Sequence, residues 1–155
     1  MSKNWVGVCA VIGLTAAIAM RCGAADGVWK SPSTGAWSDG SKWVDGVIAG
    51  GGGVATFQGA SGYYEITNDM GTVVLSEIRG NPDSTPDSIA AEWRLRGGTF
   101  ELISPALLNT PAHGLNLRGT TLAGSADVTI TGPGRTFLGD DNLFTGRTIV
   151  SNGNA

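Results

Sequence analysis

The stretch EWRLRGGTFELIS, residues 92–104, alternates large apolar and polar side chains on both sides of a Gly-Gly pair. An alternation with a period of two is typical of a β-strand that buries one face and exposes the other. We expect the glycine pair at residues 97 and 98 to let the apolar side chains of both halves face the same core. The pattern therefore predicts two rows, with Trp93, Leu95, Phe100 and Leu102 inside and Glu92, Arg94, Arg96, Thr99 and Glu101 outside.

Outward from this stretch, the chain is built of similar short segments rich in Val, Ile, Thr, Phe and Tyr, which Gly, Asn, Asp or Pro separate. Each has the length of a strand. In residues 84–93, Thr85 is a helix cap and Pro86 takes the first helical position, so a single helical turn is expected there. The chain is otherwise predicted to be almost wholly β, with strands such as VATF at 54–57 and DVTIT at 127–131.

The connections between strands decide how an all-β fold closes. Tight two-residue hairpin turns are sparse in this chain. Successive strands are also too close together for crossover helices. We therefore expect the coils of a parallel β-helix, with about 20 to 25 residues in each coil. An antiparallel β-sandwich is the alternative.

The segment GPGRTFLGDDNLFTGRTIVSNG, residues 132–153, spaces its glycines and an asparagine regularly around two short strands. It resembles the autotransporter-associated β-strand repeat of long surface and secreted bacterial proteins. The segment departs from that repeat where Thr136 and Phe137 exchange polar and apolar slots, where Asp140 replaces a glycine, and where Arg147 replaces another. The matching positions, with Phe144 at the aromatic one, are Gly132, Gly134, Leu138, Asn142, Phe144, Thr145, Gly146, Thr148, Val150 and Gly153.

The resemblance implies a right-handed parallel β-helix in an exported passenger or surface protein. The tryptophans among Gly, Ser and Asp in residues 28–46, and the VATF strand after them, are also similar to this family. Glycines in such a repeat take positive φ at coil corners. Asn142 is expected to bond nearby backbone or to stack in a ladder of asparagines. The candidates to fill the interior or to pack beneath a loop are Leu138, Phe144, Ile149 and Val150.

The first 25 residues have the organisation of a secretory signal peptide. Lys3 precedes an uncharged run over residues 6–20, which is shorter than the roughly 20 residues that span a bilayer. Small residues follow, and cleavage is expected after Ala25 or after Ala24. An uncleaved membrane anchor is the alternative.

The signal peptide at 1–25 is followed, in our interpretation, by a Trp- and Gly-rich cap and linker at 26–53 and a β-solenoid at 54–155. Residues 132–155 hold the clearest repeat. Both cysteines lie in the signal peptide, so the mature chain is expected to fold without disulfides and without thiolate zinc sites.

The tryptophans Trp29, Trp37 and Trp43 allow two interpretations. They either close the end of the core, as a solenoid requires, or form an aromatic platform that stacks on sugar rings. The run AGGGGV at 49–54 lacks the Lys and Ser or Thr of a phosphate-binding loop. We expect it to be a flexible linker between the tryptophan segment and the solenoid.

No residue pattern predicts catalysis. Asp140 and Asp141 are adjacent, and neighbours on a strand point to opposite faces. His113, the only histidine, lies in a loop without an acid nearby to orient it. No catalytic, cofactor-binding or metal-ligating residue is therefore assigned, no cofactor is expected, and the chain is predicted not to be an enzyme.

The charge of the chain limits the classes of partner that it is expected to bind. Beyond the signal peptide the chain carries 8 basic and 13 acidic residues, scattered singly, which disfavours nucleic acid. We expect an exported structural or adhesive passenger, at the cell surface or outside the cell. Its expected partners are surface polysaccharide or other cell-surface components, with membrane contact only during export and self-association through open solenoid ends.

Two other functions stay open: a secreted carbohydrate-binding β module that uses the tryptophans, and a β-helix polysaccharide lyase or hydrolase. No pattern of a C-terminal membrane barrel follows the repeat. We therefore expect a fragment of a longer repeat protein, or a chain that relies on another exporter.

Overall fold

The structure, a computed structural model, describes residues 23–30, 33–58, 62–80, 91–110, 114–139 and 142–151. The described chain is all-β, apart from the short 3-10 turns η1 (Gly40–Lys42) and η2 (Val44–Gly46). Thr85 and Pro86, which predict a helical turn, lie outside the described residues. The strands are β1 (Gly27–Trp29), β2 (Gly35–Ala36), β3 (Gly53–Phe57), β4 (Gly62–Thr67), β5 (Thr72–Gly80), β6 (Ala91–Asn109), β7 (Gly114–Ala123), β8 (Val128–Thr131), β9 (Arg135–Leu138) and β10 (Thr148–Ser151).

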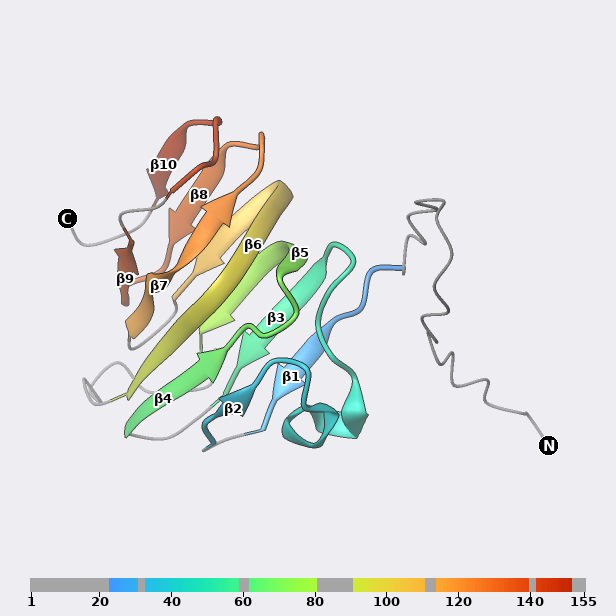
Figure 1. Ribbon diagram of the computed structural model, residues 1–155. Coiled ribbons are helices and arrows are strands. Elements are labelled where there is room, and N and C mark those ends of the chain that lie inside the picture. The colour runs from blue at the N-terminus through green and yellow to red at the C-terminus, as the bar shows by residue number, and fades with distance from the viewer. Residues whose placement is uncertain are drawn as a thin grey trace.

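Each ladder between these strands is parallel. Figure 1 shows the strands side by side, from β1 and β2 at one end of the molecule to β8, β9 and β10 at the other. Within the described residues, antiparallel pairing is confined to two isolated bridges, Ala25 with Gly50 and Trp29 with Trp43. The antiparallel β-sandwich is therefore wrong, and the parallel pairing expected of a solenoid is confirmed.

Strand β6 explains how all these strands share one sheet, because its 19 residues take part in four ladders. Its first part pairs with β4 and β7, its middle with β5 and β7, and its end with β5 and β8. The ladder through its end joins residues 28, 23, 30, 22 and 20 positions apart, so three spacings fall within the expected coil length of about 20 to 25 residues and two exceed it. The residues in register are Gly27, Ala55, Ile78, Leu108, Ile130 and Val150.

The core lies behind the inward row predicted for residues 92–104. All four inward side chains are buried, and the five outward ones are partly exposed. Gly97 and Gly98 both have positive φ and let the chain turn between the two halves without leaving the core. The predicted facing of this stretch is confirmed.

The tryptophan segment belongs to the same core. Trp29, Trp37 and Trp43 have no exposed surface, and their rings meet edge to face, with centroids 5.1 and 5.0 Å apart. Each indole N–H donates to a backbone carbonyl, as buried tryptophans require. The tryptophans therefore close the core near β1 and β2, and no aromatic platform is open to sugars there.

The glycine run at 49–54 is not a flexible linker. Gly50 forms a two-way backbone bridge with Ala25, at 2.9 and 3.1 Å, and Gly53 is already in β3. A Cβ atom on Gly53 would collide with the carbonyl of Ala25. The run is glycine-rich because two backbones touch, so the linker expectation is wrong and the tryptophan segment pairs directly with the strands after it.

The repeat at 132–153 supplies one strand to each of two ladders, β9 beside β7 and β10 beside β8. Leu138 and Phe144 pack against the core as expected. Ile149 and Val150 do not, since their side chains are 39% and 63% exposed. In the described residues β10 pairs with β8 alone, so no further strand covers its outer edge.

Asn142 donates its side-chain N–H to the carbonyl of Gly139, so the predicted bond to nearby backbone is confirmed. The ladder of asparagines is not formed at this position, because Asn142 pairs with Leu122 in the neighbouring strand. The structure also shows which side chains of β9 face inward and which face outward. Thr136 faces Thr110, with 3.2 Å between hydroxyl oxygens, while the ring of Phe137 lies under Arg118 on the outer surface.

Candidate functional site

The residues weighed for catalysis, Asp140, Asp141 and His113, lie outside the described residues. In the part that is described, no group of three His, Cys, Asp or Glu side chains is close enough to hold a metal ion. The same residues contain no helix with the length and apolar character needed to cross a membrane.

The candidate site lies at the corner between the first and middle parts of β6. From Arg94 to Arg96, β6 advances two residues while its partner β7 advances three, from Asn116 to Gly119. Immediately afterwards β6 advances three residues while β7 advances two, to Thr121. Two β-bulges of opposite sense thus follow each other and restore the register. Bulges re-aim side chains and are frequent beside functional sites.

Side chains and backbone from three successive passes of the chain are bonded together at this corner. The side-chain N–H group of Asn68 donates to the carbonyls of Gly71 and Thr99, at 3.2 and 3.1 Å. The hydroxyl of Thr120 donates to the carbonyls of Gly97 and Gly98, at 2.6 and 3.0 Å. The corner is therefore fixed on both sides of the glycine pair.

The bulges leave an open hollow of about 320 Å³ on the surface. Its walls are backbone, hydroxyl groups and one guanidinium, and contain no apolar side chain. The side chain of Arg96 lies across Gly119, where any Cβ atom would displace it. The residues that line the hollow are Gly97, Gly98, Arg118, Gly119, Thr120 and Thr121.

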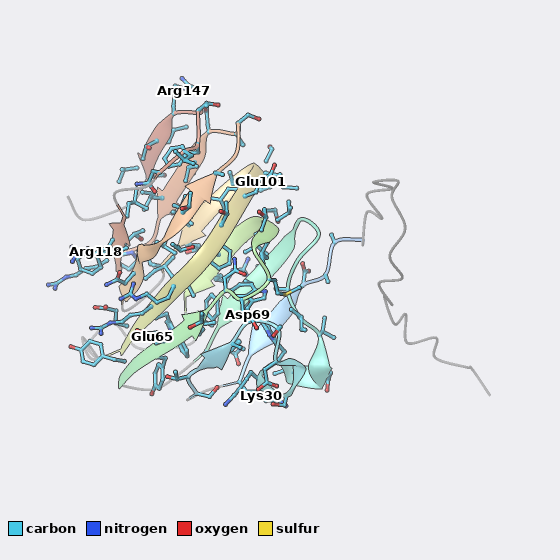
Figure 2. The ribbon with its side chains drawn as sticks, in the orientation of Figure 1. Lys30, Glu65, Asp69, Glu101, Arg118 and Arg147 are labelled. Atoms are coloured by element: carbon cyan, nitrogen blue, oxygen red, sulfur yellow. The ribbon has the colours of Figure 1, made fainter. Side chains whose placement is uncertain are left out.

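A charged surface extends from the hollow across β4, β6, β7 and β9, and Figure 2 shows Glu65 and Arg118 on it, at the same side of the molecule. We call it the arginine face. Its outward side chains carry a net charge of +2, with four arginines and two glutamates, although the whole chain has a net charge of −3. The arginine face consists of Tyr63, Glu65, Glu92, Arg94, Arg96, Asn116, Arg118, Arg135 and Phe137.

Hydrogen bonds connect the middle of the arginine face. The carboxylate of Glu92 accepts from the guanidinium of Arg94 at 2.7 Å and from the side chain of Asn116 at 2.8 Å. Arg96 lies 3.6 Å from the carboxylate of Glu65. The guanidinium of Arg94 also covers the ring of Tyr63, with 4.5 Å between its central carbon and the ring centroid.

These contacts keep the pair of Glu92 and Arg94 charged. Partial burial acts to raise the pKa of Glu92, but hydrogen bonds from Arg94 and Asn116 outweigh it, and the pKa of the carboxyl is lowered. The hydrogen bond to Glu92 raises the pKa of Arg94 in turn. The middle of the face is therefore internally neutralised at neutral pH.

Arg118 and Arg135 differ from the other arginines of the described chain, because neither has an ion-pair partner there. Arg118 is exposed and stacks on Phe137, with its central carbon 4.7 Å from the ring centroid. Arg135 lies two residues before Phe137 on the same side of β9. In the described residues, two arginines without an ion-pair partner thus lie on this face, Arg118 in the wall of the hollow and Arg135 further along β9. The four paired arginines are Arg79, Arg94, Arg96 and Arg147.

Sequence reasoning missed this site. A glycine pair in one strand and an Arg-Gly pair, Arg118-Gly119, in a later one are ordinary turn signals when each is read alone. The hollow forms because the two pairs meet in neighbouring strands. A spacing of 22 residues brings Thr121 beside Thr99 and places the two bulges next to each other.

A scan against models of known protein families, a search of curated proteins and a search of solved structures all return no match to this chain. The resemblance of residues 132–153 to the autotransporter-associated repeat therefore stays a prediction that rests on those residues.

Proposed function

We propose that this chain is a right-handed parallel β-helix and a non-enzymatic structural or adhesive part of an exported surface protein of the autotransporter-associated repeat type. The observation that carries the proposal is the ladder that passes in chain order through β1, β3, β5, β6, β8 and β10. Parallel strands paired in this order, with no crossover helix in the described connections, are the pairing that stacked coils produce.

The chemistry of the described surface favours an adhesive or structural role, which depends on the length of the molecule and on the surface that it presents. The aromatic side chains that bury most area close the core, where they stabilise the fold and are closed to ligands. The described surface offers an open hollow with polar walls, whereas enzymes usually hold their substrates in deeper, mostly apolar clefts. An adhesive or structural role needs no such cleft.

Export is the part of the proposal that the N-terminal sequence supports. Lys3, the uncharged run at 6–20 and the small residues after it have the order of a secretory signal peptide. The two expected cleavage positions differ in effect, because Ala25 is bonded to Gly50 through two backbone hydrogen bonds. Cleavage after Ala24 retains this bridge, and cleavage after Ala25 removes it.

Expression of the full chain in a bacterial host, followed by intact-mass measurement of the periplasmic and extracellular protein, tests the proposal. We expect a product that begins at Ala25 or Asp26. A matched variant, Leu14→Arg, interrupts the uncharged run and should leave the chain unprocessed in the cytoplasm. Recovery of the unprocessed wild-type chain from the cytoplasm alone would reject export.

A further inference from the structure

The hollow beside Arg118 selects against apolar ligands. Its lining residues are three glycines, two threonines and an arginine. Apolar surface placed there would gain no apolar partner, whereas a ligand rich in hydroxyl groups would find hydrogen-bonding groups on each wall. A volume of about 320 Å³ is at the lower end of the range for small-molecule sites. The hollow therefore has the size and polarity for a sugar unit of a longer chain.

Charge specifies the ligand further. Arg118 and Arg135 have no carboxylate partner in the described residues, and the guanidinium of Arg118 lies over the ring of Phe137. A planar guanidinium of this kind matches carboxylate and sulfate oxygens through paired hydrogen bonds. Restricting the side chain before binding also reduces the entropy lost when a ligand orders it.

A polysaccharide fits this surface better than a nucleic acid. Nucleic acids are bound through many phosphate contacts along a strongly basic surface. The arginine face has a net charge of only +2, on a chain whose overall charge is −3. Separate arginines that have no ion-pair partner in the described residues, on a face with a polar hollow, suit a ligand that combines hydroxyl groups with a negative charge on each repeat.

We propose that the hollow, with Arg118 in its wall and Arg135 further along the same face, binds an acidic polysaccharide, with its carboxylate or sulfate groups on the two guanidinium groups. The ligand extends along the outer side of β7 and β9. The inference gives a ligand class to the surface protein proposed above and rests on that proposal for its biological setting. Binding is measured on purified protein, so its failure is distinct from failure of export.

Isothermal titration of the purified full chain at low ionic strength tests the inference with two matched pairs of probes. Dextran sulfate and unmodified dextran differ in sulfate, while polygalacturonate and its methyl ester differ in free carboxylate. We expect binding of one or both anionic polymers and none of the neutral ones. The anionic polymer that binds identifies which acidic group is recognised. Binding should weaken as salt is added, because the arginines are exposed.

Variants locate the site. Arg118→Gln should weaken binding about tenfold, as expected for loss of one charge-assisted pair of hydrogen bonds. Arg118→Lys, which retains charge without the planar group, should recover only part of that loss. Arg147→Gln is the matched control, since Arg147 is 81% exposed and lies far from Arg118 in Figure 2. It should bind as the wild type does.

Three outcomes would overturn the inference: no binding of either anionic polymer, equal binding of the neutral ones, or equal losses in the Arg118→Gln and Arg147→Gln variants. Single-stranded DNA is the remaining probe. Binding of DNA as tight as that of the acidic polysaccharide, with the same dependence on Arg118, would show a general polyanion surface and reject the polysaccharide assignment.

Discussion

Arg147 holds the carboxylate of Asp127 through three hydrogen bonds, although 20 residues separate them. Its backbone N–H donates at 2.8 Å, and its guanidinium donates at 3.0 and 2.6 Å. Arg147 stands where the resembled repeat has a glycine. A long side chain fits at this position because Arg147 lies on the surface, opposite the carboxylate of Asp127 on the preceding pass of the chain. The neighbouring Gly146 is constrained, since a Cβ atom there would collide with the carbonyl of Ala126.

The contact between Asp127 and Arg147 predicts a local response to pH. The side-chain hydrogen bond from Arg147 lowers the pKa of Asp127 below its ordinary value of 3.8. An acid with a lowered folded-state pKa contributes stability above its unfolded pKa and loses it as pH falls through the folded-state pKa. Amide protection of Arg147 and Val128, measured by hydrogen exchange and corrected for intrinsic rates, should therefore decrease below about pH 3.8.

The Asp127→Asn variant should remove this pH response at Arg147 and leave a second one intact. Ser38 donates to Asp69 through its hydroxyl and its amide, and these bonds lower the pKa of Asp69. Protection of the Ser38 amide should still decrease in acid. Equal pH profiles at Arg147 in the wild type and in Asp127→Asn would contradict the assignment.

Alanine substitutions at Gly98 and Gly71 distinguish the cost of backbone strain from the cost of steric collision. Both have positive φ, at 48° and 79°, which costs other residues roughly 1–2 kcal/mol. A Cβ atom on Gly71 meets nothing within 4 Å, whereas one on Gly98 lies 2.5 Å from the carbonyl oxygen of Gly71 and from the side chain of Asn68. We expect Gly98→Ala to be the more destabilising by about 2 kcal/mol, because it also breaks the hydrogen bonds of Asn68. Urea unfolding of the two variants measures this difference, and equal losses would contradict it.

The tryptophan cluster should dominate the stability of the chain. Trp43 is completely buried, contacts the rings of Trp29 and Trp37, and donates to the carbonyl of Trp37 at 2.9 Å. Trp43→Ala should lower the free energy of unfolding by about 3–5 kcal/mol. Tyr63→Ala is the control, since Tyr63 is 68% exposed and should change stability by about 0.5 kcal/mol or less. Similar midpoints for the two variants in urea would count against the assigned role of Trp43.

The outer edge of β10 should promote association. In the described residues this strand pairs only with β8, and Val150 is 63% exposed. Light scattering of the purified chain should show a mass that rises with concentration, and Val150→Lys should suppress the rise, because a charge on an edge strand opposes further pairing. Met70→Lys, at another exposed apolar side chain, should associate like the wild type. A wild-type monomer at all concentrations would refute the prediction.

Alternation in residues 92–104 was sufficient to predict which side chains face the core, because a strand has a fixed period of two. Parallel pairing could be inferred from the scarcity of hairpin turns. The sequence failed at the glycine run 49–54, where flexibility and close backbone contact favour the same residue. It failed again at Ile149 and Val150, since an apolar strand has the same pattern whether or not a neighbour covers it.

The sequence by itself determined that the described chain is β and which faces of its central strand are buried, because these properties depend on side chains a few residues apart. Only the tertiary structure decided that two opposed bulges, at Gly97-Gly98 and Arg118-Gly119, meet at one corner and form a hollow. It likewise decided which arginines have carboxylate partners. The reason is that these contacts join strands more than 20 residues apart in the sequence. Their register depends on the summed lengths of the intervening loops.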